Sequence, residues 1–383
     1  MNPGKITSVS RISPLKRLSP SRFLAVKECA LREVWAADGA PSLLPSSPRA
    51  RLGTVIHSLL ELAGNGQLGT SPEGQIDKTW GRLVSKCEAQ MSNSWLERSL
   101  VPLSKTVPDF EVRRLRARRI ALHMAAGAGA SVEASQEVRG IGFEVWVETA
   151  DHLVGGRIDE MQPSADGPKL RDYKTGQILE ADTPEGISTI KISYQTQLRL
   201  YAALYACKFG QWPSRLEVVD LDGREFEVPF EIASCEALLE EASRVLATIN
   251  EKIQNSRSTQ EAANILATPG PSNCSACSYR PECPAYRTAR QRSSLTGWPA
   301  DVFGIVQYVR TLANGRISLG INTPTSPTTL TRVRNLEPTE TRHPALNFLK
   351  EGDLVGIFNV RGDQQGSDFS ESSMTAVYSL EST

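Results

Sequence analysis

The chain has 383 residues, enough for two or three domains, and a hydrophobic fraction of 40% is sufficient for a packed core. Its formal net charge is zero, so no global field attracts it to nucleic acid, and any such contact must come from local basic patches. The sequence has no run of eighteen apolar residues and no apolar signal region near its start, so we expect a cytoplasmic protein without a membrane span.

The N-terminal third of the chain predicts helices after a polar start. Residues 1–20 are rich in proline and serine and predict a flexible N-terminal arm. Ser19 and Pro20 then indicate a helix start, with serine as the N-cap and proline in the first turn. Further helices are expected over 52–62 and, interrupted by two prolines, over 76–127.

The pattern changes to short strands and turns at about residue 137. The expected elements are strands at 142–147, 153–159 and 170–174, a helix at 193–208, a hairpin at 215–228 and a helix at 235–253. The hairpin carries Asp222 and Gly223 at its turn. No internal repeat and no Walker A sequence is present, so we expect no ATP-driven motor in this chain.

Two acids and a lysine stand on neighbouring predicted strands. Asp159 ends the run Gly156-Arg157-Ile158-Asp159, and Asp172 precedes Lys174 by two residues, so both side chains of the second strand face the same side. Carboxylates bind Mg²⁺ or Mn²⁺, which can activate water and stabilise a phosphorane, while a lysine neutralises developing charge. The pattern indicates metal-dependent phosphodiester hydrolysis, although Asp-x-Lys alone is common on ordinary surface hairpins.

The surrounding motifs resemble the PD-(D/E)xK nuclease superfamily, in its RecB/AddB/Cas4-like branch. The resemblance covers roughly residues 20–290 and rests on four segments in order: Gly53-Thr54-Val55-Ile56-His57, Gly156-Arg157-Ile158-Asp159, Asp172-Tyr173-Lys174-Thr175-Gly176 and Gln197-Leu198-Arg199-Leu200-Tyr201. It implies an α/β fold with a restriction-endonuclease-like mixed central sheet flanked by helices.

The same resemblance implies roles for individual residues. Asp159, Asp172, His57 and the backbone carbonyl of Tyr173 would bind Mg²⁺ or Mn²⁺, and Lys174 would be catalytic. Gln197 and Tyr201, one helical turn apart, would face the site and contact DNA or orient the lysine. The alternatives are a buried helix histidine at position 57 and a packing role at position 201. Glu137 stands where some members carry a further acid.

Cys274, Cys277 and Cys283 form a C-x₂-C-x₅-C cluster, one thiolate short of a four-ligand site. Cys29 is the candidate for the fourth ligand. A subgroup of the same branch holds a 4Fe–4S cluster with one cysteine before the nuclease core and three after it. The resemblance therefore implies such a cluster as a mechanical staple, closing a nuclease domain over 21–292, with structural Zn²⁺ as the alternative. The other cysteines, Cys87, Cys207 and Cys235, lie in apolar helical contexts and are expected in the core.

Two further segments lie outside these motifs. Five arginines between Arg113 and Arg119 predict either a phosphate-binding patch or a solvated helix face. Residues 295–383 predict strands at 302–308, 316–322, 353–360 and 374–380. We expect a small β-barrel there, an OB-fold in the first instance, on which Tyr308 and Phe358 would stack bases unless these rings are buried against the nuclease domain or a partner.

The sequence thus predicts a metal-dependent DNA nuclease. The resemblance favours exonuclease action on single-stranded or frayed DNA ends, in DNA repair and recombination or in defence against foreign DNA, with a separate helicase as a partner. An endonuclease acting on structured DNA or RNA is one alternative. A non-catalytic DNA-binding scaffold subunit of a helicase–nuclease complex is another.

Overall fold

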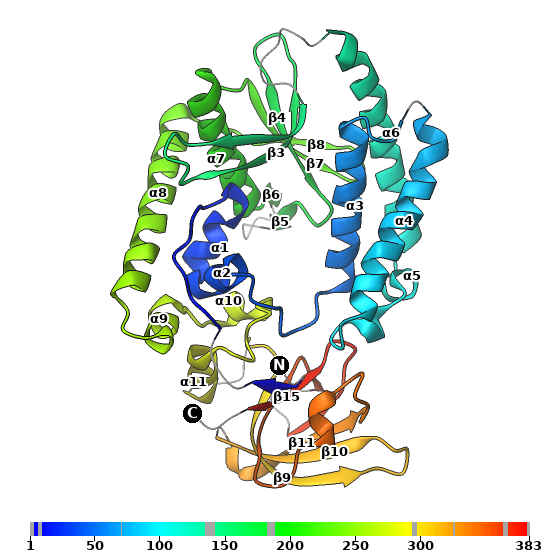
Figure 1. Ribbon diagram of the computed structural model, residues 1–383, viewed down its shortest axis with the longest axis vertical. Coiled ribbons are helices and arrows are strands. Elements are labelled where there is room, and N and C mark those ends of the chain that lie inside the picture. The colour runs from blue at the N-terminus through cyan, green and yellow to red at the C-terminus, as the bar shows by residue number, and fades with distance from the viewer. Residues whose placement is uncertain are drawn as a thin grey trace.

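A computed structural model describes residues 4–6, 10–69, 71–134, 142–181, 188–292, 297–324, 326–362 and 367–380. Glu137, the further acid expected from the sequence, lies outside these residues. The described chain forms a large helix-flanked unit and a smaller β-rich module at one end (Figure 1). None of the helices in the described part is long and apolar enough to cross a membrane.

A five-stranded mixed sheet lies at the centre of the larger unit. Its order is β2 (Gly142–Glu148), β3 (Gly155–Gln162), β4 (Lys169–Lys174), β7 (Arg215–Asp220) and β8 (Glu225–Glu227). All neighbouring pairs are antiparallel except β4 and β7, which are parallel. The expected meander of strands and the hairpin at 215–228 are confirmed. A shorter pair, β5 (Leu179–Ala181) and β6 (Ser188–Ile190), was not predicted from the sequence.

Helices cover the two faces of this sheet (Figure 1). On one face, α3 (Pro48–Gly64), α4 (Pro72–Ser92) and α6 (Phe110–Ala134) share a core with Tyr173 and Val219 of the sheet. On the other, α7 (Ile192–Phe209) and α8 (Ile232–Asn255) share a core with Leu170, Leu216 and Val218. Alternate strand residues therefore supply both cores, as the period of two requires. The mixed sheet flanked by helices agrees with the expected fold class.

The N-terminal segment differs from the expected single helix and flexible arm. A short turn η1 (Pro20–Arg22) leads to α1 (Phe23–Glu28), which stops at Cys29, and α2 (Ala30–Ala37) begins directly after it. Cys29 is extended, with φ −157° and ψ 98°, and this interrupts the helical hydrogen bonds. Before the turn, Leu15 and Leu18 are buried, and Leu18 bridges to Val154 beside the central sheet. Apolar side chains thus fasten a segment whose overall composition is polar.

Shorter elements connect the main layers. The turn η2 (Arg98–Leu100) and helix α5 (Leu103–Thr106) link α4 to α6, near the two prolines that interrupt the predicted helical region. After α8, the chain continues through α9 (Thr259–Leu266), α10 (Pro271–Ser275) and α11 (Pro284–Arg292). These last helices lie between the central unit and the β-rich module (Figure 1).

The C-terminal module contains an eight-stranded sheet in the order β1-β15-β12-β9-β10-β11-β14-β13. Its strands are β1 (Lys5–Ile6), β9 (Val302–Thr311), β10 (Ile317–Thr323), β11 (Ser326–Leu336), β12 (Leu354–Phe358), β13 (Arg361–Gly362), β14 (Asp368–Ser370) and β15 (Ala376–Leu380). The four predicted strands are confirmed. Strand β1 comes from the chain's N-terminal segment and pairs in parallel with β15, so this module is not built from C-terminal residues alone.

The described strands do not confirm an OB-fold barrel, because β1 and β13 stand at opposite edges of the sheet and are not paired with each other. For Phe358, the alternative of a buried docking ring holds in place of base stacking. Its side chain is fully buried and packs edge-on against Phe303 and Tyr378. Tyr378 in turn contacts Trp95 and donates a hydrogen bond from its hydroxyl to the carbonyl oxygen of Leu43 at 2.7 Å. These rings therefore dock the module onto the larger unit.

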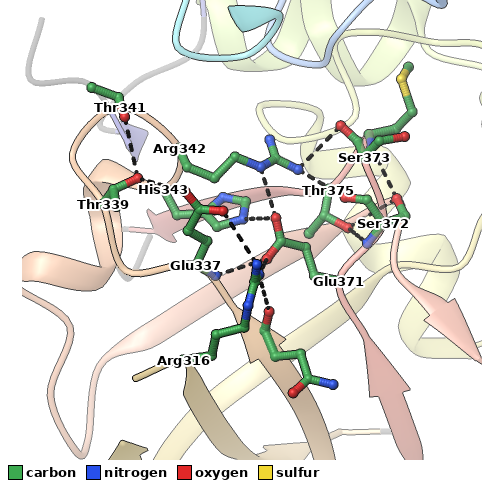
Figure 2. A network of polar contacts seen from close by, with 12 residues as sticks. Arg316, Glu337, Thr339, Thr341, Arg342, His343, Glu371, Ser372, Ser373 and Thr375 are labelled. Atoms are coloured by element: carbon green, nitrogen blue, oxygen red, sulfur yellow. Dashed lines mark hydrogen bonds and ion pairs between the residues drawn. The ribbon is translucent and has the colours of Figure 1, made fainter. Parts of the chain in front are cut away.

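A polar network ties the loop after β11 to the segment before β15 (Figure 2). The carboxylate of Glu371 accepts hydrogen bonds from Arg342 at 2.8 Å and from Arg316 at 3.4 Å, and lies 3.0 Å from Nε2 of His343. His343 is fully buried beside the turn η3 (Pro344–Asn347). One carboxylate thus holds three cationic or imidazole side chains and fixes the return of the chain into the sheet.

Candidate active site

The two acids of the sequence motif lie side by side on the central sheet. Glu160 of β3 pairs with Arg171 of β4, and Asp159 and Asp172 are the next positions beyond this pair. The backbone N–H of Tyr173 donates to Oδ2 of Asp159 at 2.8 Å, which fixes the first acid against the second strand. Asp172 is only 3% exposed. The sheet register therefore converts two acids thirteen residues apart into one pair.

Lys174 is held beside this pair by two polar groups and one ring. Its Nζ lies 2.7 Å from Oδ2 of Asp172 and donates to Oε1 of Gln197 at 3.1 Å. Gln197 also donates from Nε2 to Oδ1 of Asp172 at 2.7 Å. The ammonium lies 4.8 Å from the ring centroid of Tyr194, in a cation–π contact that the sequence did not suggest. One buried glutamine thus positions both the acid and the lysine.

The electrostatics follow from burying charges of both signs together. Burial and the neighbouring charge of Asp172 raise the pKa of Asp159 well above its ordinary value. Burial alone would lower the pKa of Lys174, but the charge and hydrogen bond of Asp172 outweigh it and raise that pKa. Lys174 therefore stays charged, while the two acids repel each other in a place where a bound cation would relieve the repulsion.

His57 and Tyr201 approach the acids from opposite helices. His57 on α3 lines the same cleft as Asp159 and Asp172. Although the residue keeps an exposed edge, enclosure of its imidazole and the charge of Lys174 lower the pKa of His57. Tyr201 on α7 is 4% exposed, and burial followed by the charges of Asp159 and Asp172 raises the pKa of its hydroxyl. Tyr201 faces the site and packs there as well.

Two motif glycines permit these close approaches. A Cβ at Gly53 would lie 3.0 Å from Oγ1 of Thr175, so glycine lets α3 approach the loop after β4. A Cβ at Gly156 would lie 3.0 Å from Cδ of Pro20 and 3.1 Å from the hydroxyl oxygen of Tyr201. The bare backbone at Gly156 therefore accommodates both the N-terminal turn and the tyrosine.

An open cleft of about 1010 Å³, a volume that includes solvent at its mouth, contains the site. The wall of the cleft includes residues to which the sequence analysis assigned no role, because they lie in the N-terminal segment, on β2, or within a motif at a position other than the acid. They are Arg17, Arg22, Trp146 and Arg157. Three arginines at the margin of an acidic centre suit a polyanion that passes over it.

A small recess beside Asp159 carries two more acids. It is lined by Glu61 of α3 and Glu144 of β2, together with His57 and Tyr173. The strand register places Glu144 opposite Asp159, and its backbone is left-handed, with φ +52°. Burial and the charge of Glu61 raise the pKa of Glu144. Glu144 carries no separate signal in the sequence, because an acid in a strand is usually a surface residue.

Of the two alternatives for the arginine-rich run on α6, a phosphate-binding patch or a solvated helix face, its ion pairs with acids favour the solvated face. Arg116 lies 2.9 Å from Asp222, and Arg114 and Arg118 lie 2.9 and 3.2 Å from Asp77. Arg113 pairs with Asp109 and also donates to the carbonyl oxygen of Thr175 at 2.8 Å. Acids brought in by α4 and by the β7–β8 turn therefore neutralise much of the run.

The four cysteines of the predicted cluster line one pocket, whose volume of about 330 Å³ includes solvent at its mouth. Cys29 enters from the break between α1 and α2, and Cys274, Cys277 and Cys283 enter from α10 and the segment that follows it. Burial raises the pKa of Cys277 to about 11 and that of Cys283 to about 12. The four cysteines that the sequence suggested as one ligand set therefore line the same pocket, and their role as ligands stays a prediction.

Arg280 closes the cavity on one side. Its guanidinium donates to the carbonyl oxygens of Cys274, Ser275 and Cys277 at 2.9, 3.0 and 3.1 Å. Among the other cysteines, Cys87 and Cys235 are buried as expected, whereas Cys207 is exposed and that prediction is wrong. None of the seven is in a disulfide.

In the described ranges, no group of three or more His, Cys, Asp or Glu side chains stands in an arrangement that could hold a metal ion. The side chains present are still of the kinds that bind a divalent metal ion or an iron–sulfur cluster. Two carboxylates meet at the sheet, and the ammonium of Lys174 lies 2.7 Å from Oδ2 of the buried Asp172. Four thiols share a cavity with Arg32 and Arg280, whose charges would favour thiolates.

A comparison with known proteins agrees with this geometry. A search of curated proteins finds no match to the chain. The family model described as the PD-(D/E)XK nuclease superfamily matches residues 17–284, which include both acids, the lysine and all four clustered cysteines. Because that match covers more than half of a chain whose acids and lysine meet on a mixed sheet, the protein belongs to the PD-(D/E)XK nuclease superfamily.

Proposed function

We propose that the protein is a metal-dependent DNA nuclease with its active centre at Asp159, Asp172 and Lys174. The observation that carries the proposal is the buried contact of Lys174 with Asp172 and Gln197, next to a second acid and inside an open cleft. A purely structural ion pair would not need an open cleft or a second, like-charged neighbour.

Asp159 and Asp172 would hold Mg²⁺ or Mn²⁺, with the Tyr173 carbonyl and His57 as further ligands. When bound, the ion would polarise the phosphate and lower the pKa of a water molecule. Lys174 would place its ammonium beside the phosphate oxygens on which charge develops. Gln197 would keep that ammonium and the Asp172 carboxylate in register, and Tyr201 would close the floor of the site.

We further propose exonuclease action on single-stranded or frayed DNA ends, within the RecB/AddB/Cas4-like branch. The support is the Gly53-Thr54 … His57 helix, which brings the histidine to the cleft. A role in DNA repair, recombination or defence against foreign DNA follows from that branch, and the lack of a Walker A sequence in the chain suggests a separate helicase as partner.

The four-cysteine cavity would hold a 4Fe–4S cluster, or Zn²⁺ as the alternative. Support comes from convergence of Cys29 with three cysteines more than two hundred residues away on one cavity. The site would staple the N-terminal helices to the segment after the core, and such long closures restrict the unfolded chain strongly. Unpaired thiols suit the reducing cytoplasm, which we propose as the location.

Anaerobic purification followed by a cleavage assay tests both parts. Wild type and Lys174→Ala are incubated with end-labelled single-stranded and duplex DNA and with RNA, in Mg²⁺ or Mn²⁺. Cleavage of DNA that requires Lys174, with progressive shortening from an end, supports the proposal; discrete internal cuts support an endonuclease. Binding without cleavage by wild type under either metal would overturn the catalytic assignment and favour the scaffold subunit.

The cluster has its own readout in the same preparation. Brown colour with bound iron that is lost in Cys277→Ser, and retained in the exposed control Cys207→Ser, supports 4Fe–4S. Bound zinc without visible absorbance would select the alternative metal. A protein that carries neither metal after anaerobic preparation would refute the staple.

A further inference from the structure

Trp146 is an exposed aromatic residue on the wall of the active-site cleft. Its side chain is 36% exposed, whereas Trp35, Trp80 and Trp298 are buried. A single exposed apolar residue is common on protein surfaces and carries no argument by itself. Trp146, however, lines the cleft that also contains Asp159, Asp172 and Lys174. Whether Trp146 has a role in substrate binding therefore depends on its position relative to these residues.

The strand register places Trp146 beside the first acid. Trp146 on β2 pairs with Arg157 on β3. Arg157 and Asp159 are two residues apart on one strand, so they face the same side at a separation of about 6.6 Å along it. The indole, the guanidinium and the carboxylate thus form a short row on the cleft side of the sheet.

The guanidinium of Arg17 packs against the indole ring of Trp146. The guanidinium of Arg17 lies 4.9 Å from the centroid of the Trp146 ring. Arg17 is held there by a 2.9 Å hydrogen bond from Nε to the carbonyl oxygen of His152 and by a 2.9 Å ion pair with Glu148. The contact is therefore organised in advance, in a segment that crosses from the N-terminus to the sheet.

The surrounding charges define the ligand. Arg22 and Arg157 line the same cleft. The side chain of Arg22 lies 3.5 Å from Glu33 but is 44% exposed, so its outer edge can still offer positive charge to a phosphate backbone, as can Arg157. Aromatic rings and guanidinium planes recognise unstacked bases, which only a single strand presents. Arginines around an exposed indole next to a phosphodiesterase centre suit a single strand lying along this wall.

We propose that the Arg17–Trp146 pair is a stacking platform for a base of a single-stranded substrate, next to the phosphate that is cleaved. The proposal rests on the nuclease function proposed above and adds the part of the site that distinguishes a single strand from a duplex. The pair contacts a base, whereas Arg22 and Arg157 contact phosphates. It is a specificity determinant outside the motifs.

The test separates base stacking from phosphate binding. Full-length protein in EDTA, where no cleavage occurs, is titrated into a fluorescein-labelled oligothymidylate and into an abasic strand with the same number of phosphates. Trp146→Ala is expected to weaken oligothymidylate binding about tenfold and to leave abasic binding unchanged. Trp146→Phe, which keeps a ring, retains most of the affinity. Ile265→Ala, at an exposed apolar residue of α9 outside the cleft lining, is the control.

Arg17→Lys provides a variant that keeps the charge at the same place. Because lysine lacks the planar guanidinium, it should weaken binding of the oligothymidylate alone. Equal losses on both strands in Trp146→Ala, or no loss on oligothymidylate, would overturn the platform and leave the pair as a fastening of the N-terminal segment. Since the titration needs neither metal nor cleavage, this outcome is independent of the Lys174→Ala result.

Discussion

Removal of the Asp301 carboxylate should destabilise the protein more than removal of an exposed acid in the same module. The ion pair of Asp301 with Arg280 is 2.8 Å long, and the two side chains are 0% and 2% exposed. Asp301 also accepts hydrogen bonds from the Tyr286 hydroxyl at 2.7 Å and from the Asn359 backbone N–H at 2.8 Å. Asp301→Ala would leave a buried guanidinium and two donors without this acceptor.

The magnitude follows from these contacts. Loss of one partner of a buried ion pair costs about 3–5 kcal/mol. The Arg280 guanidinium keeps three carbonyl acceptors near the cysteines, which compensates part of its charge and favours the lower end of that range. Each donor deprived of its acceptor adds about 1 kcal/mol. We therefore expect Asp301→Ala to lower the free energy of unfolding by about 5 kcal/mol.

Urea denaturation followed by circular dichroism and tryptophan fluorescence measures this loss. Asp368→Ala is the matched control, because its 3.3 Å pair with Arg334 is exposed, with 46% and 51% of the side chains accessible. The control should change stability by less than about 1 kcal/mol. If the two variants unfold at the same urea concentration, the buried pair does not hold the module to the cysteine region and the reasoning fails.

Three other predictions address the site, a close approach and pH. Gln197→Ala should lower the rate of single-turnover DNA cleavage about 100-fold, because misplacement of a catalytic group by about 1 Å has that effect. The control Gln195→Ala removes a hydrogen bond to the Ile190 carbonyl instead and should cleave normally. Equal cleavage rates for the two variants would contradict the positioning role of Gln197. Gly156→Ala should destabilise the protein by about 1–3 kcal/mol in thermal unfolding, since its Cβ would meet two rings, whereas Gly176→Ala, with no atom within 4 Å, should be neutral. Burial, aided by the charge of Arg342, lowers the pKa of His343 despite the opposing effect of Glu371 and Glu337. The unfolded chain therefore takes up this proton at a higher pH than the folded protein does, and stability falls as the pH drops below about 6.5. His343→Gln should reduce that loss, and the exposed His123→Gln should not; an unchanged pH profile of His343→Gln would refute the assignment.

The lowered pKa of Glu371 also makes the stability fall as the pH drops, at lower pH than His343 does. Burial would raise it, but the hydrogen bond and charge of His343, together with Arg342, lower it below the ordinary value. Its contribution to stability is thus present above the ordinary glutamate pKa and is lost as pH falls through the lower, folded value. The histidine acts first as the pH falls below about 6.5, and the glutamate adds to the loss in stronger acid.

Local pattern was sufficient for much of the fold and for the centre of the site. Alternation placed the strands around Asp159 and Asp172, and a spacing of two residues already put Lys174 on the same face as Asp172. Helical periodicity located α3 and α7, and with them His57 and Gln197. These features depend on neighbours within one or two turns of chain, so a single sequence contains them.

Long-range contacts decided the rest. Trp146 and Arg17 line the same cleft as Asp159 only because β2 pairs with β3 and the N-terminal segment crosses the sheet. The arginines of α6 are neutralised by Asp77 and Asp222, which are distant in sequence, and Phe358 is buried because the module docks through it. Local periodicity states which side of an element is apolar or charged, but not which other element will cover it. That choice is made by the packing of the whole chain, which is why the sequence by itself determined the motif of two acids and a lysine and the tertiary structure decided what surrounds it.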